Sequence, residues 1–144
     1  MEDIDWLTML SYRHELHHFS RALLSHNQKK TLTDSELEIL SLLYLYPEES
    51  TPLALSRRSG MKKEAVSRCL KQLFDKNCIQ KSKNPADERS YILSLSEIGT
   101  MELHQNYTFL LQPLYDLRRQ MGPELDQIFR LIKQANIYIN QLQK

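Results

Sequence analysis

The sequence contains few of the residues that make turns: its 144 residues include 3 glycines and 5 prolines. All-β folds usually need more of these residues, so we expect helices to dominate. No apolar run approaches the roughly 20 residues that a membrane-spanning helix needs. The N-terminal residues MEDIDWLTML are acidic before they are apolar, which does not fit a signal peptide. The composition, 41% hydrophobic and 26% charged, is that of one folded domain with a core rather than a disordered chain.

Cysteine is also scarce, with only Cys69 and Cys78 in the chain. Without a secretion signal, we expect both to be reduced thiols in a cytoplasmic protein. Redox sensing by either thiol is an alternative. It would need an exposed cysteine with a lowered pKa, and inert buried thiols are the favoured interpretation.

Positive charge is concentrated in one stretch, Thr51 to Leu95. Between Pro52 and Ser96 the sequence has ten Lys and Arg against four Asp and Glu, a balance of +6, whereas the remainder has nine against fourteen, a balance of −5. A cationic surface of this kind releases condensed counterions from the phosphates of DNA. A solvated basic helix face is the plain alternative, and the order of elements in this stretch favours DNA.

The apolar periodicity predicts a helix–turn–helix followed by a β-hairpin, with long helices at both ends of the chain. The expected helices are 4–27, 33–45, 52–59, 63–76, 97–120 and 123–142, and the expected strands are 78–83 and 89–95 around a turn at 84–88. Pro113 should bend the long helix that contains it.

Several residues mark where these helices begin and end. Thr33 and Glu36 have the spacing of a capping box, and Thr51 before Pro52 opens the next helix. Gly60 should close that helix in a left-handed conformation. Lys62 stands where a Ser or Thr cap would be expected. The loss of a side-chain cap would be compensated if the Lys62 ammonium contacts a phosphate. Ser96 should cap the helix that follows the hairpin.

Three segments of the sequence resemble the MarR family of bacterial transcription regulators. They are LTDSELEIL (32–40), LSRRSGMKKEAVSRCLKQLFDKN (55–77) and PADERSYILSLSEIGT (85–100). The last segment carries the wing pattern D-x-R as Asp87-Glu88-Arg89, and the following L-T-x-x-G pattern as Leu95 to Gly99. Asn77 departs from the glycine that is usual in the family, but Asn tolerates the left-handed conformation.

The resemblance implies a single MarR-type domain that forms a homodimer. Residues 1–30 and 97–144 would be dimerisation helices, and residues 31–96 a winged helix-turn-helix lobe. The terminal helices are also too apolar to be explained by one small lobe. The family implies a non-enzymatic regulator without a cofactor, most often a repressor. It would bind an inverted repeat in double-stranded operator DNA and be released by a small-molecule effector.

The helix 63–76 should enter the major groove of DNA. Ser67 and Arg68 are expected at base edges with Lys63 and Gln72 behind them, because an Arg fork reads guanine bidentately. Lys62 and Lys71 should contact phosphates, which position without specifying. Arg89 should reach the adjacent minor groove, with Asp87 as its orienting partner. Arg57 and Arg58 are either phosphate contacts or solvated charges.

Other residues support competing interpretations. His14 to His18 spell H-E-x-x-H, a zinc-binding string, so a metal-responsive regulator using His14, His17 and His18 (completed by His26 or His104) or a metalloenzyme has to be weighed. A polar stripe on the first helix is the favoured interpretation. A winged-helix protein-interaction module without DNA is a further alternative, but the basic recognition face argues against it. The resemblance would place an effector between the dimer helices and the DNA-binding lobe. Residues that could line such a site, or equally belong to the core, are Trp6, Tyr12, Leu16, His17 and Tyr107.

Overall fold

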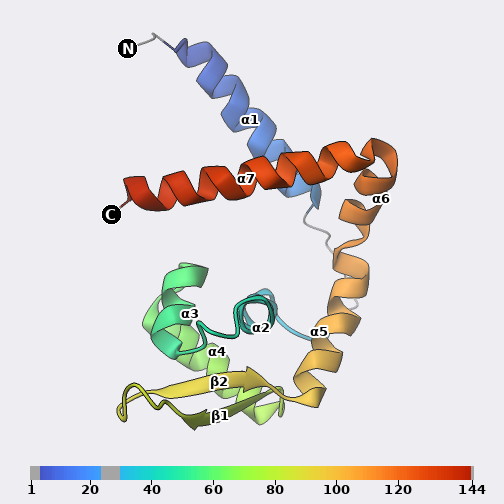
Figure 1. Cartoon of the computed structure of the whole chain (residues 1–144). Helices are drawn as coiled ribbons and strands as arrows, with labels where there is room; N and C mark the ends of the chain where they lie inside the picture. The colour runs from blue at the N-terminus through green and yellow to red at the C-terminus, as the bar shows by residue number, and fades with distance from the viewer. Residues whose placement is uncertain (1–3, 24–29, 144) are drawn as a thin grey trace. The chain divides into compact units, whose positions relative to one another are not determined.

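The computed structural model describes residues 4–23 and 30–143. It is mainly helical with one antiparallel hairpin, in the element order that the sequence predicts (Figure 1). The helices are α1 (Trp6–Leu23), α2 (Asp34–Leu45), α3 (Pro52–Ser59), α4 (Lys63–Asp75), α5 (Glu97–Leu110), α6 (Gln112–Met121) and α7 (Pro123–Leu142); the strands are β1 (Ile79–Lys83) and β2 (Tyr91–Leu95). The predicted winged helix-turn-helix with long terminal helices is therefore confirmed.

The chain forms two compact units. The described residues of the winged-helix unit are 30–109, and those of the terminal-helix unit are 4–23 and 110–143. Residues 97–109 thus belong to the same unit as the helix-turn-helix and the wing, whereas the sequence-based division begins the dimerisation helices at residue 97.

The winged-helix unit has a closed apolar core. Helix α2 packs against α3, α4 and β2, and α4 packs against α3 and β1. Helices α2, α3 and α4 and strand β2 each contribute fully buried side chains to this core. Strand β1 contributes Ile79, which is 4% exposed. The backbone N–H of Leu93 donates to the carbonyl of Ser50 at 3.0 Å, which attaches the hairpin to the segment before α3. A hairpin that is marginal alone is stabilised here by packing on the helices.

The predicted helix caps are confirmed. Thr33 Oγ1 accepts from the Glu36 N–H at 3.1 Å and Glu36 Oε1 accepts from the Thr33 N–H at 3.0 Å, completing the capping box of α2. Thr51 caps α3, and Gly60 ends it at φ +73°. Lys62 makes no side-chain capping bond to α4.

The junction of α4, β1 and α5 is held by an unusually close backbone approach. Asn77 has φ +58°, and the N–H groups of Asn77 and Cys78 donate to the carbonyls of Phe74 and Leu73, as in a Schellman motif. Ser96 then caps α5, accepting from the Gly99 N–H at 3.0 Å. A Cβ on Gly99 would lie 2.0 Å from the carbonyl oxygen of Cys78. The glycine of the L-T-x-x-G pattern, Gly99, is therefore required by packing against the Cys78 carbonyl.

Two expected elements differ in the structure. The helix expected over 97–120 is two helices, because the chain breaks at Leu111 and restarts with Pro113 in the first turn of α6. A proline has no N–H to donate and is tolerated only in the first turn of a helix. The second strand begins at Tyr91 rather than at residue 89, so Arg89 lies in the wing turn. The expected end of the first helix at residues 24–27 lies outside the described residues.

The terminal-helix unit is poorly buried by itself. Leu125 is its single buried residue among those described, and α1 has none. Phe19 and Phe129 approach with ring centroids 6.3 Å apart, and α6 packs against α1 and α7. Large apolar side chains remain exposed along α1 and α7. Within the described ranges, every helix is too short or too polar to cross a lipid bilayer.

We predict that Gly99→Ala destabilises the winged-helix unit by roughly 3 kcal/mol, because the added methyl group overlaps the Cys78 carbonyl and the backbone must move. Urea unfolding followed by circular dichroism measures the change. Met101→Ala, at a position of α5 that is 60% exposed, is the control and should change stability by less than about 1 kcal/mol. Equal stability of the two variants would contradict the packing role of Gly99.

Candidate nucleic-acid interface

Helix α4 has two sharply different faces. Val66, Cys69, Leu70 and Leu73 are buried, as the sequence predicts. The expected base-reading and phosphate-contacting residues of the helix are all exposed; they are Lys62, Lys63, Ser67, Arg68, Lys71 and Gln72. One face therefore fixes α4 in the core and leaves the other available to a ligand as wide as a DNA groove.

The cations of this face have no protein partner within the described residues. No carboxylate lies within 4.0 Å of Lys62, Lys63, Arg68 or Lys71 over residues 4–23 and 30–143. Lys62 and Lys63 also stand at the start of α4, where no side chain caps the helix. Their charges are thus not neutralised by the fold and can meet phosphates.

The wing turn is built by two short side chains. Asn84 Oδ1 accepts from the Ala86 N–H at 3.0 Å, and Asp87 Oδ1 accepts from the Arg89 N–H at 3.0 Å. The Asp87 carbonyl also accepts from the Ser90 N–H at 3.1 Å. These bonds shape the turn and place Arg89 at its exposed tip.

The expected ion pair between Asp87 and the Arg89 guanidinium is not formed in the described part of the chain. Asp87 instead holds the backbone of Arg89. In this structure Asp87 thus shapes the turn, a role that a carboxylate or an amide oxygen can fill equally, and its role as the orienting partner of Arg89 on DNA stays a prediction.

Two cations that contribute to the positive charge of this stretch have internal partners. The Arg58 guanidinium pairs with Glu49 and lies 3.6 Å from the centroid of the Tyr46 ring. Arg58 is thus neither a free phosphate contact nor a merely solvated charge, whereas Arg57 is exposed. The Lys76 ammonium lies 2.9 Å and 2.8 Å from the two carboxylate oxygens of Glu36.

Glu36 is a buried carboxylate, with no exposed surface, at the start of α2. Burial raises the pKa of this carboxyl, but the hydrogen bonds from Lys76 and Thr33 and the charge of Lys76 outweigh burial and leave the pKa below its ordinary value of 4.5. The pair joins the first turn of α2 to the end of α4. It therefore helps to fix the orientation in which α4 presents its exposed face.

Both cysteines are free and buried. Burial raises the pKa of the Cys69 thiol to about 11, and burial also raises that of Cys78. Thiols of this kind are mostly protonated at neutral pH and react slowly with oxidants. The structure thus favours inert thiols over redox sensing.

Within residues 4–23 and 30–143 the histidine cluster forms no metal site. Among the described residues, no three side chains of His, Cys, Asp or Glu lie close enough to hold a metal ion. His14, His17 and His18 are exposed on α1, and His104 stacks edge-on against Tyr44 with ring centroids 6.1 Å apart. His26 lies outside the described residues.

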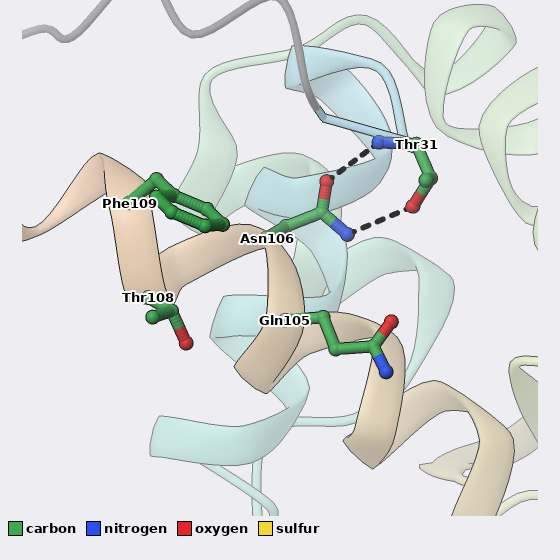
Figure 2. A pocket seen from close by; sticks show the side chains of 5 residues that line it. All are labelled: Thr31, Gln105, Asn106, Thr108 and Phe109. Atoms are coloured by element: carbon green, nitrogen blue, oxygen red, sulfur yellow. Dashed lines mark hydrogen bonds between the residues drawn. The ribbon is translucent and has the colours of Figure 1, made fainter.

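A hollow of about 460 Å³ lies on the winged-helix unit beside α5. Figure 2 shows Asn106 at its edge, where Oδ1 accepts from the Thr31 N–H at 2.9 Å and Nδ2 donates to Thr31 Oγ1 at 3.0 Å. Gln105, Thr108 and Phe109 complete the lining. None of these residues was expected from the sequence, because Thr31 and Asn106 are 75 positions apart and share no motif. Of the expected effector-lining residues, Tyr107 lies on the same helix and accepts a hydrogen bond from Ser41 at 2.8 Å.

Residues 32–91 match the model of the MarR family. The match runs from the start of α2 to the start of β2 and so contains all of α3 and α4 as well as the wing turn. The resemblance seen in the sequence is confirmed.

Solved structures of MarR regulators share the fold over nearly the whole chain. One described as a MarR family transcription regulator has a TM-score of 0.68 at 20% identity, covering 96% of this chain and 92% of its own. A MarR variant from E. coli complexed with operator DNA has a TM-score of 0.61 at 20% identity, with 92% and 99% covered. The PcaV regulator of Streptomyces coelicolor, solved with its natural ligand, has a TM-score of 0.57 at 18% identity, with 94% and 97% covered.

No curated protein matches the chain. The match to the MarR family over residues 32–91, together with a fold shared with solved regulators, supports a DNA-binding transcription regulator as the broad assignment.

We predict that Lys76→Met lowers the free energy of unfolding at pH 7 by roughly 1–3 kcal/mol, because it leaves the Glu36 carboxylate buried without its cation. The cost is below that of a fully buried pair because the Lys76 side chain is 43% exposed. Denaturant unfolding at pH 7 and at pH 3 measures it.

The effect should depend on pH with a defined sign. Since the pKa of Glu36 is lowered by folding, its contribution is present above the ordinary value of 4.5 and is lost as pH falls through the folded value. The difference between the wild type and Lys76→Met should therefore shrink at pH 3. A difference that stays constant between the two pH values would show that the Lys76 stem, and not the ion pair, is responsible.

Proposed function

We propose that this protein is a sequence-specific regulator that binds a double-stranded operator as a homodimer, with α4 in the major groove and the wing at the adjacent minor groove. The observation that carries the proposal is the division of α4 into a buried apolar face and an exposed face whose cations have no partner in the described chain. The stability of the fold does not require an exposed face of unpaired cations, whereas binding to the phosphates and major groove of DNA does.

Each exposed residue of α4 has a role by its chemistry. Arg68 can donate bidentately to guanine, and Ser67 can donate or accept at a base edge. Lys63 and Gln72 lie on the same exposed surface. Lys62 and Lys71 contact phosphates and set the register of the helix on the duplex.

The wing supplies a second contact. The turn bonded through Asp87 holds Arg89 at an exposed tip. A narrow A·T-rich minor groove has an enhanced negative potential that attracts an inserted Arg. Arg89 would therefore favour A·T-rich flanks without reading individual bases.

The homodimer is supported by the exposed apolar surface of the terminal-helix unit. Trp6 is 69% exposed, Leu16 65%, Leu131 64% and Ile137 55%. Apolar surface on this scale is unfavourable in water and is covered by a second copy in symmetric dimers. Two-fold symmetry would place the half-sites of an inverted repeat about one helical turn apart.

We further propose that the protein is a repressor released by a small-molecule effector, and the hollow beside α5 supports this. Thr31 stands three residues before α2, and α2 packs on α4. A small molecule that competes for the hydrogen bonds of Asn106 would move Thr31 and the start of α2. Binding in the hollow would thus change the presentation of α4, which is how an effector releases a repressor from its operator.

We predict that the wild-type protein binds the DNA upstream of its own gene with a steep salt dependence, and that Arg89→Ala weakens this binding roughly tenfold at fixed salt. Fluorescence anisotropy over a salt series measures both. Lys133→Ala removes the same charge from the exposed surface of α7 and is the control.

Asp87→Asn separates the two roles of the aspartate. It keeps an oxygen that accepts from the Arg89 N–H, so binding should be retained if Asp87 shapes the turn. Unchanged affinity of Arg89→Ala would remove the wing from the mechanism. Equal affinity of the wild type for operator and random duplex would contradict sequence-specific regulation and favour an interaction module.

We predict a dimer of 17.1 kDa chains in solution and its dissociation in Ile137→Asp, because a carboxylate on this apolar stretch of α7 cannot be buried without a partner. Analytical ultracentrifugation measures the mass. Leu53→Asp is the control, since Leu53 is 45% exposed on the winged-helix unit. A wild-type monomer at micromolar concentration would contradict the assembly.

A further inference from the structure

The exposed face of α4 carries a carboxylate among its cations. Glu64, Arg68 and Lys71 follow one another at steps of four and three, so they form one stripe along the helix. The buried residues Val66 and Leu73 lie on the opposite side. Glu64 is therefore at the centre of the surface that would meet DNA, in the first turn of the helix.

No ion pair or hydrogen bond of the Glu64 side chain is formed with the described residues. This distinguishes Glu64 from Glu49 and Glu36, which pair with Arg58 and Lys76. Its negative charge repels phosphates and weakens binding to every sequence equally. A carboxylate that weakens DNA binding from the exposed face of α4 needs a compensating role.

Two roles are physically available. The positive end of the helix dipole stabilises a carboxylate in the first turn, and Lys62 supplies no side-chain cap here. This role is structural and independent of DNA sequence. The other role is recognition, because the N-terminal residues of a recognition helix contact base edges in the major groove.

We infer that Glu64 is a specificity-determining residue that selects a cytosine in each half-site, an inference that rests on the proposed function. Its carboxylate accepts a hydrogen bond from the exocyclic amino group of cytosine N4. Adenine offers an amino group too, but its N7 acceptor lies beside it and repels a carboxylate. Guanine and thymine offer acceptors to the major groove, and they repel it as well.

The arrangement makes Glu64 and Arg68 complementary. Arg68, one turn further along the same stripe, donates to guanine O6 and N7. Glu64 accepts hydrogen bonds and Arg68 donates them, so the two side chains recognise a base that donates and a base that accepts, respectively. The repulsion between Glu64 and phosphates weakens binding to every sequence, and the bond to cytosine offsets this loss only at the specific site, so the ratio of specific to non-specific binding rises.

The test is selection of bound duplexes from a randomised DNA library, followed by affinity measurements on single-base variants of the selected site at fixed salt. The full-length wild type, Glu64→Ala and Glu64→Gln are compared. Asp75→Asn, which removes a negative charge from the other end of the exposed face of α4, is the matched control.

Glu64→Ala should lose the preference for C·G at one position of each half-site, roughly tenfold per half-site, and should bind random duplex more tightly. Glu64→Gln should change the preferred pair at that position to A·T, because an amide pairs bidentately with adenine N6 and N7. Asp75→Asn should tighten binding to all duplexes and keep every base preference.

A Glu64→Ala protein that keeps all wild-type base preferences overturns this inference and leaves the proposed function standing. A uniform loss of affinity together with a lower unfolding midpoint also overturns it, in favour of helix stabilisation. A wild-type protein that selects no sequence overturns the proposed function itself.

Discussion

The contact between Glu36 and Lys76 is the constraint on which the presentation of the exposed cationic face of α4 depends. A carboxylate without exposed surface is costly unless charge and hydrogen bonds compensate it. Here the compensation comes from two directions: the Thr33 N–H belongs to the first turn of α2, and the Lys76 ammonium follows the last turn of α4. One side chain thus completes the cap of one helix and holds the end of another. The exposed face of α4 lies opposite its buried face. Fixing the orientation of α4 against α2 therefore fixes which side chains of α4 point to solvent.

The same end of α4 is also the start of the wing. Cys78 donates to the Leu73 carbonyl, and its own carbonyl accepts from the Ser96 N–H and abuts Gly99. A single residue thereby ties α4 to the beginning of α5 and to strand β1. These bonds leave little freedom between α4 and the hairpin that carries Arg89. Preorganisation of this kind reduces the entropy lost when two separate contacts must engage one duplex.

The sequence predicts local features better than partners in space. Thr33, Thr51 and Gly60 act within a few residues of themselves, so spacing alone locates the helix ends, and the strong periodicity of α4 predicts its buried face. Pro113 shows the limit: its presence predicts a disturbance of the helix, but it does not decide between a bend and the break that the structure has at Leu111. The partners of Arg58 and Lys76 lie outside their own helices, so counting charges overstates the number of cations free for DNA. The hollow at Asn106 has no sequence signal at all.

The two units differ in what they complete by themselves. The winged-helix unit has a buried apolar core and pairs its buried carboxylate with Lys76, and it leaves the cations on the exposed face of α4 without partners among the described residues. The terminal-helix unit leaves apolar surface uncovered, with α1 containing no buried residue in its described length. Unpaired charge and uncovered apolar surface call for different partners, a polyanion in one case and a complementary apolar surface in the other. In the proposed homodimer a second copy would cover the apolar surface, and the pair would present two α4 helices to one duplex, so that the second would engage as an intramolecular step.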